Sequence, residues 1–323
     1  MEYIQPEILS EINSRKDTNP FIDGKLPIIS APMYSVYDNT GNFNRYFLED
    51  LSNHMYITIP RETDHLNFSD MWTSIDLDDF EYMVNETKEL SNMNILVDIA
   101  NGHMEKLYNL TKVFLENFPN CKLIVGNIAN PKTYEKYAEL GVWGVRCGIG
   151  TGSVCETTTN TGIHYPSELL IPECYKIKKT GNFKTKIIAD GGIRSTRDIN
   201  LRLSWGADLV MLGGMLTQTL ESNNTPYLFK TIPINNKKVA AWLFENGYKL
   251  HKKHQGMSTI EVQKKWGRLL NELRHSEGKT DWYSVKYTAS TLTYDIESAI
   301  RSVLSYTGLN NLEDFIGYNV DIS

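Results

Sequence analysis

The chain has 323 residues and a formal net charge of −6, with a hydrophobic fraction of 41% and a charged fraction of 22%. These values are ordinary for a globular protein, and the length suits one α/β barrel. They exclude the basic footprint of a nucleic-acid-binding protein and the polybasic face of a membrane-surface protein. No apolar run approaches membrane-spanning length, and residues 1–19 lack the apolar core of a signal peptide, so we expect a cytoplasmic protein.

Short apolar runs alternate along the chain with longer amphipathic stretches. The runs predict eight strands, at Leu26–Ser30, Tyr56–Pro60, Met71–Ile75, Ile95–Ile99, Lys122–Gly126, Val142–Cys147, Thr185–Ala189 and Asp208–Leu212. The amphipathic stretches predict helices, among them Met104–Phe118, Pro131–Leu140, Pro166–Lys179 and Thr196–Trp205. Asn130 is a good helix cap, and Pro131 stands where a first helical turn tolerates proline.

Eight strands that alternate with helices indicate a parallel sheet closed into a (β/α)₈ TIM barrel. No repeat or low-complexity linker interrupts the pattern, so we expect a single catalytic domain over residues 1–323. Within it, residues 1–24 are predicted to form an N-terminal arm. Residues 222–290 are predicted to form an active-site flap and a C-terminal excursion.

A glycine-rich loop, residues 148–158, follows the sixth predicted strand and contains Cys155. A lone cysteine is most often a small apolar filler. Three glycines in five residues, however, fold a backbone tightly at the end of the barrel where such folds hold their chemistry. A thiol placed there is a candidate nucleophile. The other cysteines lie in or beside apolar or amphipathic runs without metal-ligand spacing and are expected to be buried thiols, which suits a reducing compartment: Cys121, Cys147 and Cys174.

Two more glycine turns end the seventh and eighth predicted strands, at Asp190-Gly191-Gly192 and Gly213-Gly214. Each alone is also explained by a tight strand–helix connection. Together they occupy the two loops that usually bind phosphate in such barrels, where backbone N–H groups approach an anion. Asp190 would repel a phosphate, so we expect it to accept a hydrogen bond from a ribose hydroxyl.

These motifs closely resemble those of the IMP dehydrogenase/GMP reductase family, from about Leu26 to about Gly308. The segments that carry the resemblance are Gly148–Thr157, Thr161-Gly162, Tyr165-Pro166, Ala189–Gly192, Met211–Leu216 and Glu221-Ser222. Three further stretches resemble the reductase branch: Asp98–Gly102, Gln255–Ser258 and Leu273–Thr280. The chain lacks the paired (CBS-type) regulatory insert of many IMP dehydrogenases and their Arg-Tyr pair in a mobile flap.

The resemblance implies an NADPH-dependent oxidoreductase that converts GMP to IMP and ammonia. It implies that Cys155 adds to C2 of the purine and forms a covalent thioimidate. By the same resemblance, Thr157 and Glu277 relay the proton that lets ammonia leave. A positioned acid typically contributes about 10²–10⁴-fold to such a step. The family also implies a homotetramer and a potassium or other monovalent cation.

The resemblance further assigns binding residues. The substrate residues are Asp190, Gly191, Gly192, Gly213 and Gly214 for the ribose phosphate, Gly256, Met257 and Ser258 for the purine, and Arg274, Ser276 and Gly278 in a segment that closes over it. The cofactor residues are Arg61, Asp98, Ile99, Ala100, Ile149, Gly150, Leu273 and Arg274. The residues at the monovalent cation are Gly150, Gly152, Cys155 and Thr158.

Several positions depart from the family pattern. Thr151 replaces a proline, and Glu156 places a carboxylate beside Cys155, which would raise the pKa of the thiol unless Glu156 points to solvent. Arg61 stands near the position of a lysine that grips NADPH, with the register uncertain by one residue. Other assignments therefore stay open: an IMP dehydrogenase-like or other purine-nucleotide oxidoreductase, one specific for deoxynucleotides, one that uses NADH, and a non-catalytic nucleotide-binding subunit.

Overall fold

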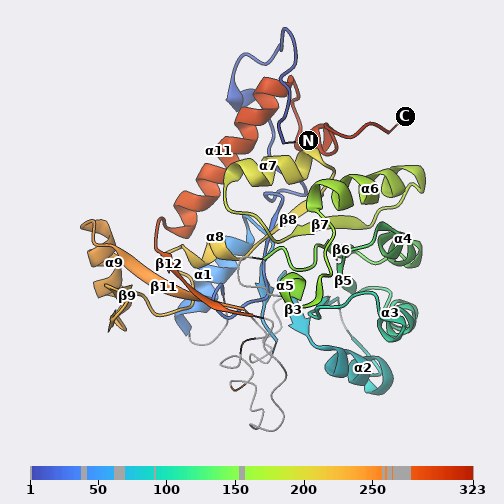
Figure 1. Cartoon of the computed structure of the whole chain (residues 1–323), viewed down its shortest axis with the longest axis horizontal. Coiled ribbons are helices and arrows are strands. Elements are labelled where there is room, and N and C mark those ends of the chain that lie inside the picture. The colour runs from blue at the N-terminus through green and yellow to red at the C-terminus, as the bar shows by residue number, and fades with distance from the viewer. Residues whose placement is uncertain are drawn as a thin grey trace.

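The computed structural model describes residues 2–37, 42–61, 70–90, 92–152, 157–256, 259, 264 and 278–322. All eight predicted strands are present, and they run parallel in the order β1-β8-β7-β6-β5-β4-β3-β2 (Figure 1). They are β1 (Ile28–Ser30), β2 (Thr58–Ile59), β3 (Trp72–Ile75), β4 (Asn94–Val97), β5 (Lys122–Ile128), β6 (Gly144–Cys147), β7 (Lys186–Asp190) and β8 (Leu209–Leu212). A parallel bridge between Ile29 and Tyr56 joins the two ends of the sheet, which confirms the predicted (β/α)₈ barrel.

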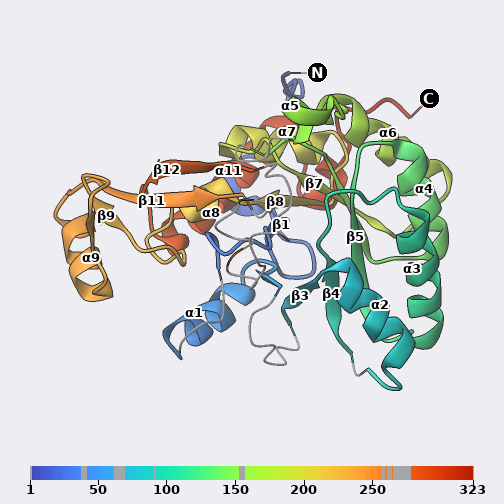
Figure 2. The same ribbon diagram turned by 60° about the horizontal axis from the view of Figure 1, so that its bottom comes forward.

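Helices surround the barrel on its outer face (Figure 2). They are α1 (Asn42–Ser52), α2 (Leu77–Glu86), α3 (Glu105–Asn117), α4 (Pro131–Leu140), α6 (Ser167–Thr180), α7 (Thr196–Ser204), α8 (Gly214–Thr217) and α11 (Ala289–Thr307). A short helix, α5 (Thr157–Thr161), lies over the end of the barrel, next to the glycine-rich loop after β6. The start of α4 is as predicted, because the Asn130 side chain accepts a hydrogen bond from the Lys132 amide and Pro131 is the first helical residue. Gly141 ends the helix with a φ of 81°, a conformation that glycine adopts without strain.

The strands bury both faces, which explains why they are nearly continuous apolar runs. One set of side chains fills the inside of the barrel, and it includes Leu96, Ile124 and Ile188. Their neighbours along the same strands, such as Val125 and Ile187, face outward and pack against the helices. Fully burying an aliphatic side chain of this size contributes roughly 1.5–3 kcal/mol, so these two layers supply much of the driving force for folding.

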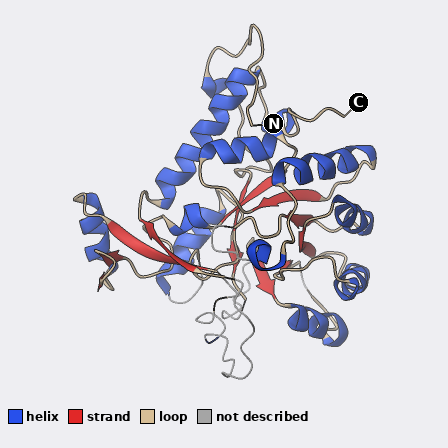
Figure 3. Ribbon diagram, viewed as in Figure 1, coloured by secondary structure: helices blue, strands red, loops and turns tan. Residues whose placement is uncertain are grey.

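A second sheet lies beside the barrel, in the segment expected to form a flap and excursion (Figure 3). Its antiparallel strands have the order β10-β9-β11-β12, and α9 projects next to it. The bounds are β9 (Tyr227–Leu228), β10 (Ile232–Pro233), α9 (Lys237–Glu245), β11 (Leu250–Gln255) and β12 (Thr280–Ser284). The sequence did not predict these four strands. The division of the chain into one domain, an arm and an excursion stays a prediction.

The remaining elements are a 3₁₀ helix, η1 (Arg15–Asp17), and a short C-terminal helix, α12 (Leu312–Phe315). The long helix α11 packs against α7 through a stripe of buried residues at helical spacing, which includes Ile296 and Ile300. Among the described helices, none is both long and apolar enough to cross a membrane.

Candidate functional site

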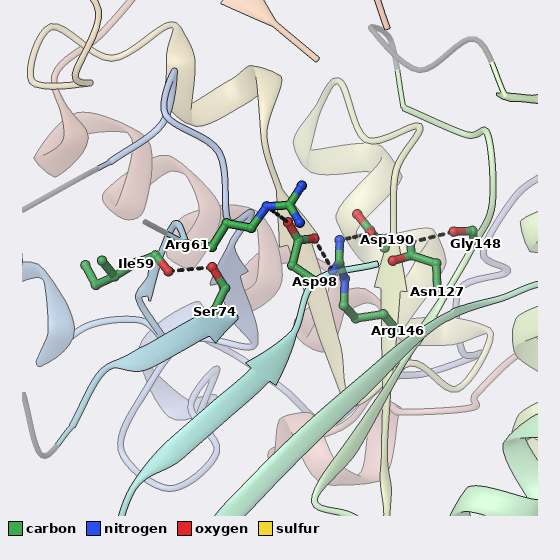
Figure 4. A network of polar contacts seen from close by, with 8 residues as sticks. All are labelled: Ile59, Arg61, Ser74, Asp98, Asn127, Arg146, Gly148 and Asp190. Carbon is green, nitrogen blue, oxygen red and sulfur yellow. Dashed lines mark hydrogen bonds and ion pairs between the residues drawn. The ribbon is translucent and has the colours of Figure 1, made fainter. Parts of the chain in front are cut away.

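A buried arginine joins two of the predicted binding residues at the carboxyl end of the barrel (Figure 4). Arg146 lies on β6, with Asp98 just after β4 on one side and Asp190 at the end of β7 on the other. Its NH1 donates to Asp98 Oδ1 at 2.9 Å, and its NH2 donates to Asp190 Oδ2 at 3.0 Å. The predicted cofactor residue Asp98 and the predicted ribose residue Asp190 are therefore fixed by one rigid guanidinium.

The charge on Arg146 is stabilised by its partners. Its side chain is 8% exposed, and such burial disfavours the charged form. Against that desolvation, the carboxylates Asp190 and Asp98 raise the pKa of Arg146 above its ordinary value. The Arg146 guanidinium therefore stays charged, and removal of it or of either carboxylate would leave a buried charge with one partner fewer.

The cysteine loop is held against the loop that follows β7. Thr151 Oγ1 donates to the Asp190 carbonyl at 2.7 Å, and Asn127 Nδ2 donates to both Gly148 O and Asp190 Oδ2 at 2.7 Å. There is no room for side chains between the two loops. A Cβ on Gly148 would lie 2.3 Å from Asp190 O, and one on Gly191 would lie 2.1 Å from Thr151 Oγ1. Thr151 stands where the family has proline. Its hydrogen bond to the Asp190 carbonyl restrains the loop, as the ring of a proline would otherwise do.

Two of the predicted cation residues lie in contact. A Cβ on Gly150 would fall 1.7 Å from Thr158 Oγ1, so the loop packs directly on the start of α5. The Thr158 hydroxyl donates to the Ile163 carbonyl at 3.1 Å. Backbone carbonyls are suitable ligands for potassium, but the contact between Gly150 and Thr158 involves the threonine hydroxyl and amide and does not by itself define a cation site. Among the described residues no cluster of His, Cys, Asp or Glu could hold a metal ion, and the monovalent cation stays a prediction.

At the end of β8, the two glycines lie against the second sheet. A Cβ on Gly213 would lie 3.8 Å from His254 Cε1, and one on Gly214 would lie 2.8 Å from the ring of Tyr283. His254 Nδ1 contacts the hydroxyls of Ser35 (3.0 Å) and Thr217 (2.8 Å). Burial lowers the pKa of His254 to about 4, against the opposing carboxylate of Asp281, so the imidazole is neutral at pH 7. Gly214 is needed here to make room for the Tyr283 ring, in addition to any role toward an anion, whereas Gly213 is less crowded by the described residues.

A buried lysine anchors the second sheet to the barrel. Lys252 on β11 has no exposed surface, and its Nζ donates to the carbonyls of Thr219, Leu220 and Ser222 and to the Ser222 hydroxyl. Burial lowers the pKa of Lys252 to about 7. Because β11 continues into Gly256, this contact positions the predicted purine segment relative to the loop after β8.

The predicted cofactor residue Arg61 lies beside Asp98, at a distance of 3.9 Å between Nε and Oδ2. Its carbonyl accepts a hydrogen bond from the Tyr34 hydroxyl at 2.6 Å, which fixes the backbone just after β2. The Arg61 side chain is 15% exposed. Its role toward a cofactor phosphate stays a prediction. Ile99 and Ile149 lie nearby in the carboxyl-end loops, where the Ile99 carbonyl accepts from the Asn127 amide at 3.2 Å.

Some predicted site residues lie outside the described residues: Cys155, Glu277, Met257, Ser258, Leu273, Arg274 and Ser276. Their roles stay predictions. Thr157 is described as the first residue of α5, and Gly152 stands immediately before the segment that holds Cys155. Gly256 is held by its amide, which donates to the Lys279 carbonyl at 3.1 Å next to Gly278.

Sequence analysis missed three residues that build this site: Arg146, Asn127 and His254. Arg146 had a usable signal, because a charged residue inside a buried strand must find partners. Asn127 gave a weaker one, at the end of an apolar run. His254 gave none, since its hydroxyl partners, Ser35 in a loop and Thr217 at the end of α8, are distant from it in sequence.

Comparison with known proteins gives consistent matches. A family model described as "IMP dehydrogenase / GMP reductase domain" matches residues 78–319. The chain is 31% identical to GMP reductase 2 of Homo sapiens over 251 residues, which is 78% of this chain and 66% of that protein. It is 27% identical to a GMP reductase of Buchnera aphidicola over 301 residues, 90% of this chain and 80% of that protein. For the human, bovine and mouse relatives the match spans 58–66% of their length.

Proposed function

The chain belongs to the IMP dehydrogenase/GMP reductase family, and from this membership we propose that it is a GMP reductase. The proposed reaction is the NADPH-dependent reductive deamination of GMP to IMP and ammonia. Family membership supports an oxidoreductase that acts on a purine nucleotide. The reductase assignment rests further on the three reductase-like stretches at Asp98–Gly102, Gln255–Ser258 and Leu273–Thr280.

One observation carries the proposal: the loop that contains Cys155 packs on the loop that contains Asp190. The contact from Thr151 Oγ1 to Asp190 O and the glycines at 148 and 191 bring these loops together. A nucleotide bound with its ribose at Asp190 would then present its base toward the cysteine loop. Holding substrate and nucleophile in register supports a reaction that a free thiol performs poorly in water.

In the proposed chemistry, the Cys155 thiolate adds to C2 of guanine and gives a tetrahedral adduct. Thr157 and Glu277 deliver a proton to the amino group, so that the C–N bond breaks and ammonia leaves. The product is a thioimidate that joins Cys155 to the purine. Hydride addition at C2 then breaks the C–S bond and releases IMP together with the restored thiol. Two moderate barriers replace one difficult displacement.

NADPH, when bound, supplies the hydride for this step. Arg61, Asp98, Ile99, Ala100, Ile149 and Gly150, with Leu273 and Arg274, are the residues proposed to hold it. The Asp98–Arg146–Asp190 network serves both subsites. It fixes Asp98, proposed to border the cofactor, relative to Asp190, proposed to bind the ribose. A monovalent cation on the cysteine loop and a homotetrameric assembly complete the proposal.

The test is to mix the protein with NADPH and each of GMP, dGMP, AMP, XMP and IMP, and to follow the nicotinamide absorbance band. We expect oxidation of NADPH with GMP, with IMP and ammonia formed in equal amounts. Oxidation of IMP with NAD⁺, and no reaction with GMP, would instead indicate a dehydrogenase. No turnover with any pair would overturn the proposal.

The covalent step is tested separately, by mass spectrometry of the quenched protein. Glu277→Gln keeps the shape of the side chain but loses the ionisable group, so ammonia release should slow by about 10²-fold or more. The thioimidate should then not accumulate from GMP but should still form from IMP and NADP⁺. An unmodified Cys155 under IMP and NADP⁺, in protein that turns over GMP, would rule out the covalent route.

A further inference from the structure

An arginine that sequence analysis did not select lies beside one of the predicted phosphate glycines. Arg202 is on α7, and its guanidinium stacks on the ring of Trp205 at 4.6 Å from the ring centre. Its NH2 lies 3.4 Å from the position that a Cβ on Gly192 would occupy. The same point is 3.6 Å from the carbonyl of Thr151 in the cysteine loop. The terminal group of Arg202 therefore reaches the place where the loops after β6 and β7 meet.

Within the described parts of the chain, the Arg202 guanidinium forms no ion pair with an Asp or Glu carboxylate. Its buried Nε makes no hydrogen bond, and Asp198 and Glu168 act on it only through their charge. The carboxylate of Asp198 is already used, because it accepts hydrogen bonds from the Arg194 amide and the Ser195 hydroxyl. Arg146, by contrast, has two carboxylate partners.

Such an arrangement is costly for the free protein. Burial lowers the pKa of Arg202, and the carboxylates of Asp198 and Glu168 offset this only from a distance. A half-buried cation without a partner gains more from an incoming anion than a hydrated surface lysine does. The stacking on Trp205 also fixes the plane of the guanidinium, so little side-chain entropy remains to be lost on binding.

We infer that Arg202 binds the phosphate of the purine nucleotide. The inference rests on the proposed function and adds a partly buried positive charge to the backbone N–H groups of the glycine loops. Gly191, Gly192, Gly213 and Gly214 offer only backbone N–H groups, whereas the planar fork of Arg202 matches two phosphate oxygens at once. Because Gly192 has no side chain, nothing from that residue stands between its backbone and the guanidinium, whose NH2 lies 3.4 Å from the position of a Cβ.

The experiment compares Arg202→Gln with Arg197→Gln. Arg197 is a matched control on the same helix, since its NH2 donates to the Glu2 carbonyl and its guanidinium stacks on Tyr3. Dissociation constants for GMP and for guanosine, which lacks the phosphate, are measured by calorimetry without NADPH. We expect Arg202→Gln to weaken GMP binding by about 10- to 100-fold and to leave guanosine binding within about twofold. Arg197→Gln should change neither, and Arg202→Lys should recover part of the loss.

The inference can also be tested without nucleotide, by measuring the melting temperature in the presence of inorganic phosphate. Inorganic phosphate should raise the melting temperature of the unmutated protein and of Arg197→Gln, but not that of Arg202→Gln. In turnover assays KM for GMP should rise with kcat nearly unchanged, because the contact is made equally in the ground state and the transition state.

Equal losses of GMP and guanosine binding in Arg202→Gln would overturn the inference and leave Arg202 a purely structural role. An unchanged dissociation constant for GMP together with an unchanged response to phosphate would also overturn it. Failure of the reductase proposal is a different result. It would be seen as GMP binding that depends on Arg202 in a protein that does not oxidise NADPH.

Discussion

At the amino ends of the strands aromatic rings close the barrel, whereas at the carboxyl ends a charged network does. Trp143 contacts Trp72 at 4.5 Å and Tyr56 at 5.7 Å between ring centres. Lys186 lies over the ring of Trp143, and Lys25 lies over that of Tyr56. These contacts combine apolar burial with cation–π attraction.

At the carboxyl end, the charged side chains and glycine loops are held in fixed positions at the expense of stability. Arg146 is buried between two carboxylates, and a buried ion pair of this kind is often no more stabilising than apolar residues of the same volume. Glycines 148, 150 and 191 are required by close backbone contacts, and they add flexibility to the unfolded chain. Mutations at the two ends should therefore have different effects. Those at the carboxyl end should lower activity, and those at the amino end should lower stability alone.

The largest effect is expected at Cys155. Cys155→Ala should abolish turnover of GMP and still bind the nucleotide, because the proposed ribose and phosphate contacts come from other loops. The control is Cys147→Ala on β6, where burial raises the pKa of the thiol and makes it a poor nucleophile. That variant should keep its activity per folded molecule. Turnover by Cys155→Ala at a rate near that of the unmutated protein would contradict the covalent mechanism.

The next effect is expected at Arg146, where activity and stability should fall together. Arg146→Met leaves Asp98 and Asp190 as buried carboxylates without their cation, which should cost about 3–5 kcal/mol of unfolding free energy. Urea unfolding measures this loss of stability. The kcat/KM for GMP measures the effect of Asp98 and Asp190 no longer being held in place. Adding Asp98→Asn and Asp190→Asn to Arg146→Met should restore much of the stability and none of the activity. An unchanged free energy of unfolding in Arg146→Met would show that pairing with Arg146 is not what stabilises Asp98 and Asp190 in the folded protein.

The sequence predicted the barrel because its strands are buried on both faces and so appear as apolar runs. The strands of the second sheet were not predicted, because they do not appear as apolar runs. Along β11 the buried positions alternate, but two of them are the polar residues Lys252 and His254, which hide the apolar period. β9 and β10 have two residues each, too few to form a pattern.

The site was predicted in part, since glycine positions are local signals and charge pairing is not. The turns at Gly191 and Gly213 could be placed from their neighbours in the chain. The partners of Arg146 depend on which strands lie side by side once the barrel closes, so Asp98 and Asp190 could not be paired with it beforehand. The position of Arg202 beside Gly192 likewise requires the path of α7.

At the amino end, Trp72→Ala should lower stability without lowering the activity of the folded molecules. Trp72 is 1% exposed, and truncating a buried tryptophan typically costs about 3–5 kcal/mol. The check is a urea titration together with kcat measured well below the transition. Tyr82→Ala, at an exposed aromatic on α2, serves as a surface control that should change neither quantity. A fall in kcat larger than about threefold would break the separation of the two ends.

A smaller effect is expected from His254 when the protein is acidified. The folded state holds the pKa of His254 near 4, below the ordinary 6.5, so the unfolded chain binds more protons between these values. Stability is therefore fully retained above pH 6.5 and falls as the pH drops toward 4, by up to about 3 kcal/mol. His254→Gln should flatten this part of the pH profile, whereas His54→Gln, at an exposed histidine, should leave it unchanged. Identical profiles for the unmutated protein and His254→Gln would contradict the assignment.

The smallest effect is expected at Arg61, at the edge of the charged network. We expect the protein to prefer NADPH over NADH, and Arg61→Ala to narrow that preference by about fivefold, because a guanidinium suits the geometry of a phosphate and alanine removes it. The measurement is kcat/KM for both cofactors, with Arg197→Ala as a remote control. Arg61→Lys should keep the preference in part, since it retains the charge without the fork. Equal rates with both cofactors in the unmutated protein would remove any 2′-phosphate contact from this end of the barrel. A preference that survives in Arg61→Ala would move that contact to another residue, and Arg61 would then serve only to support Asp98.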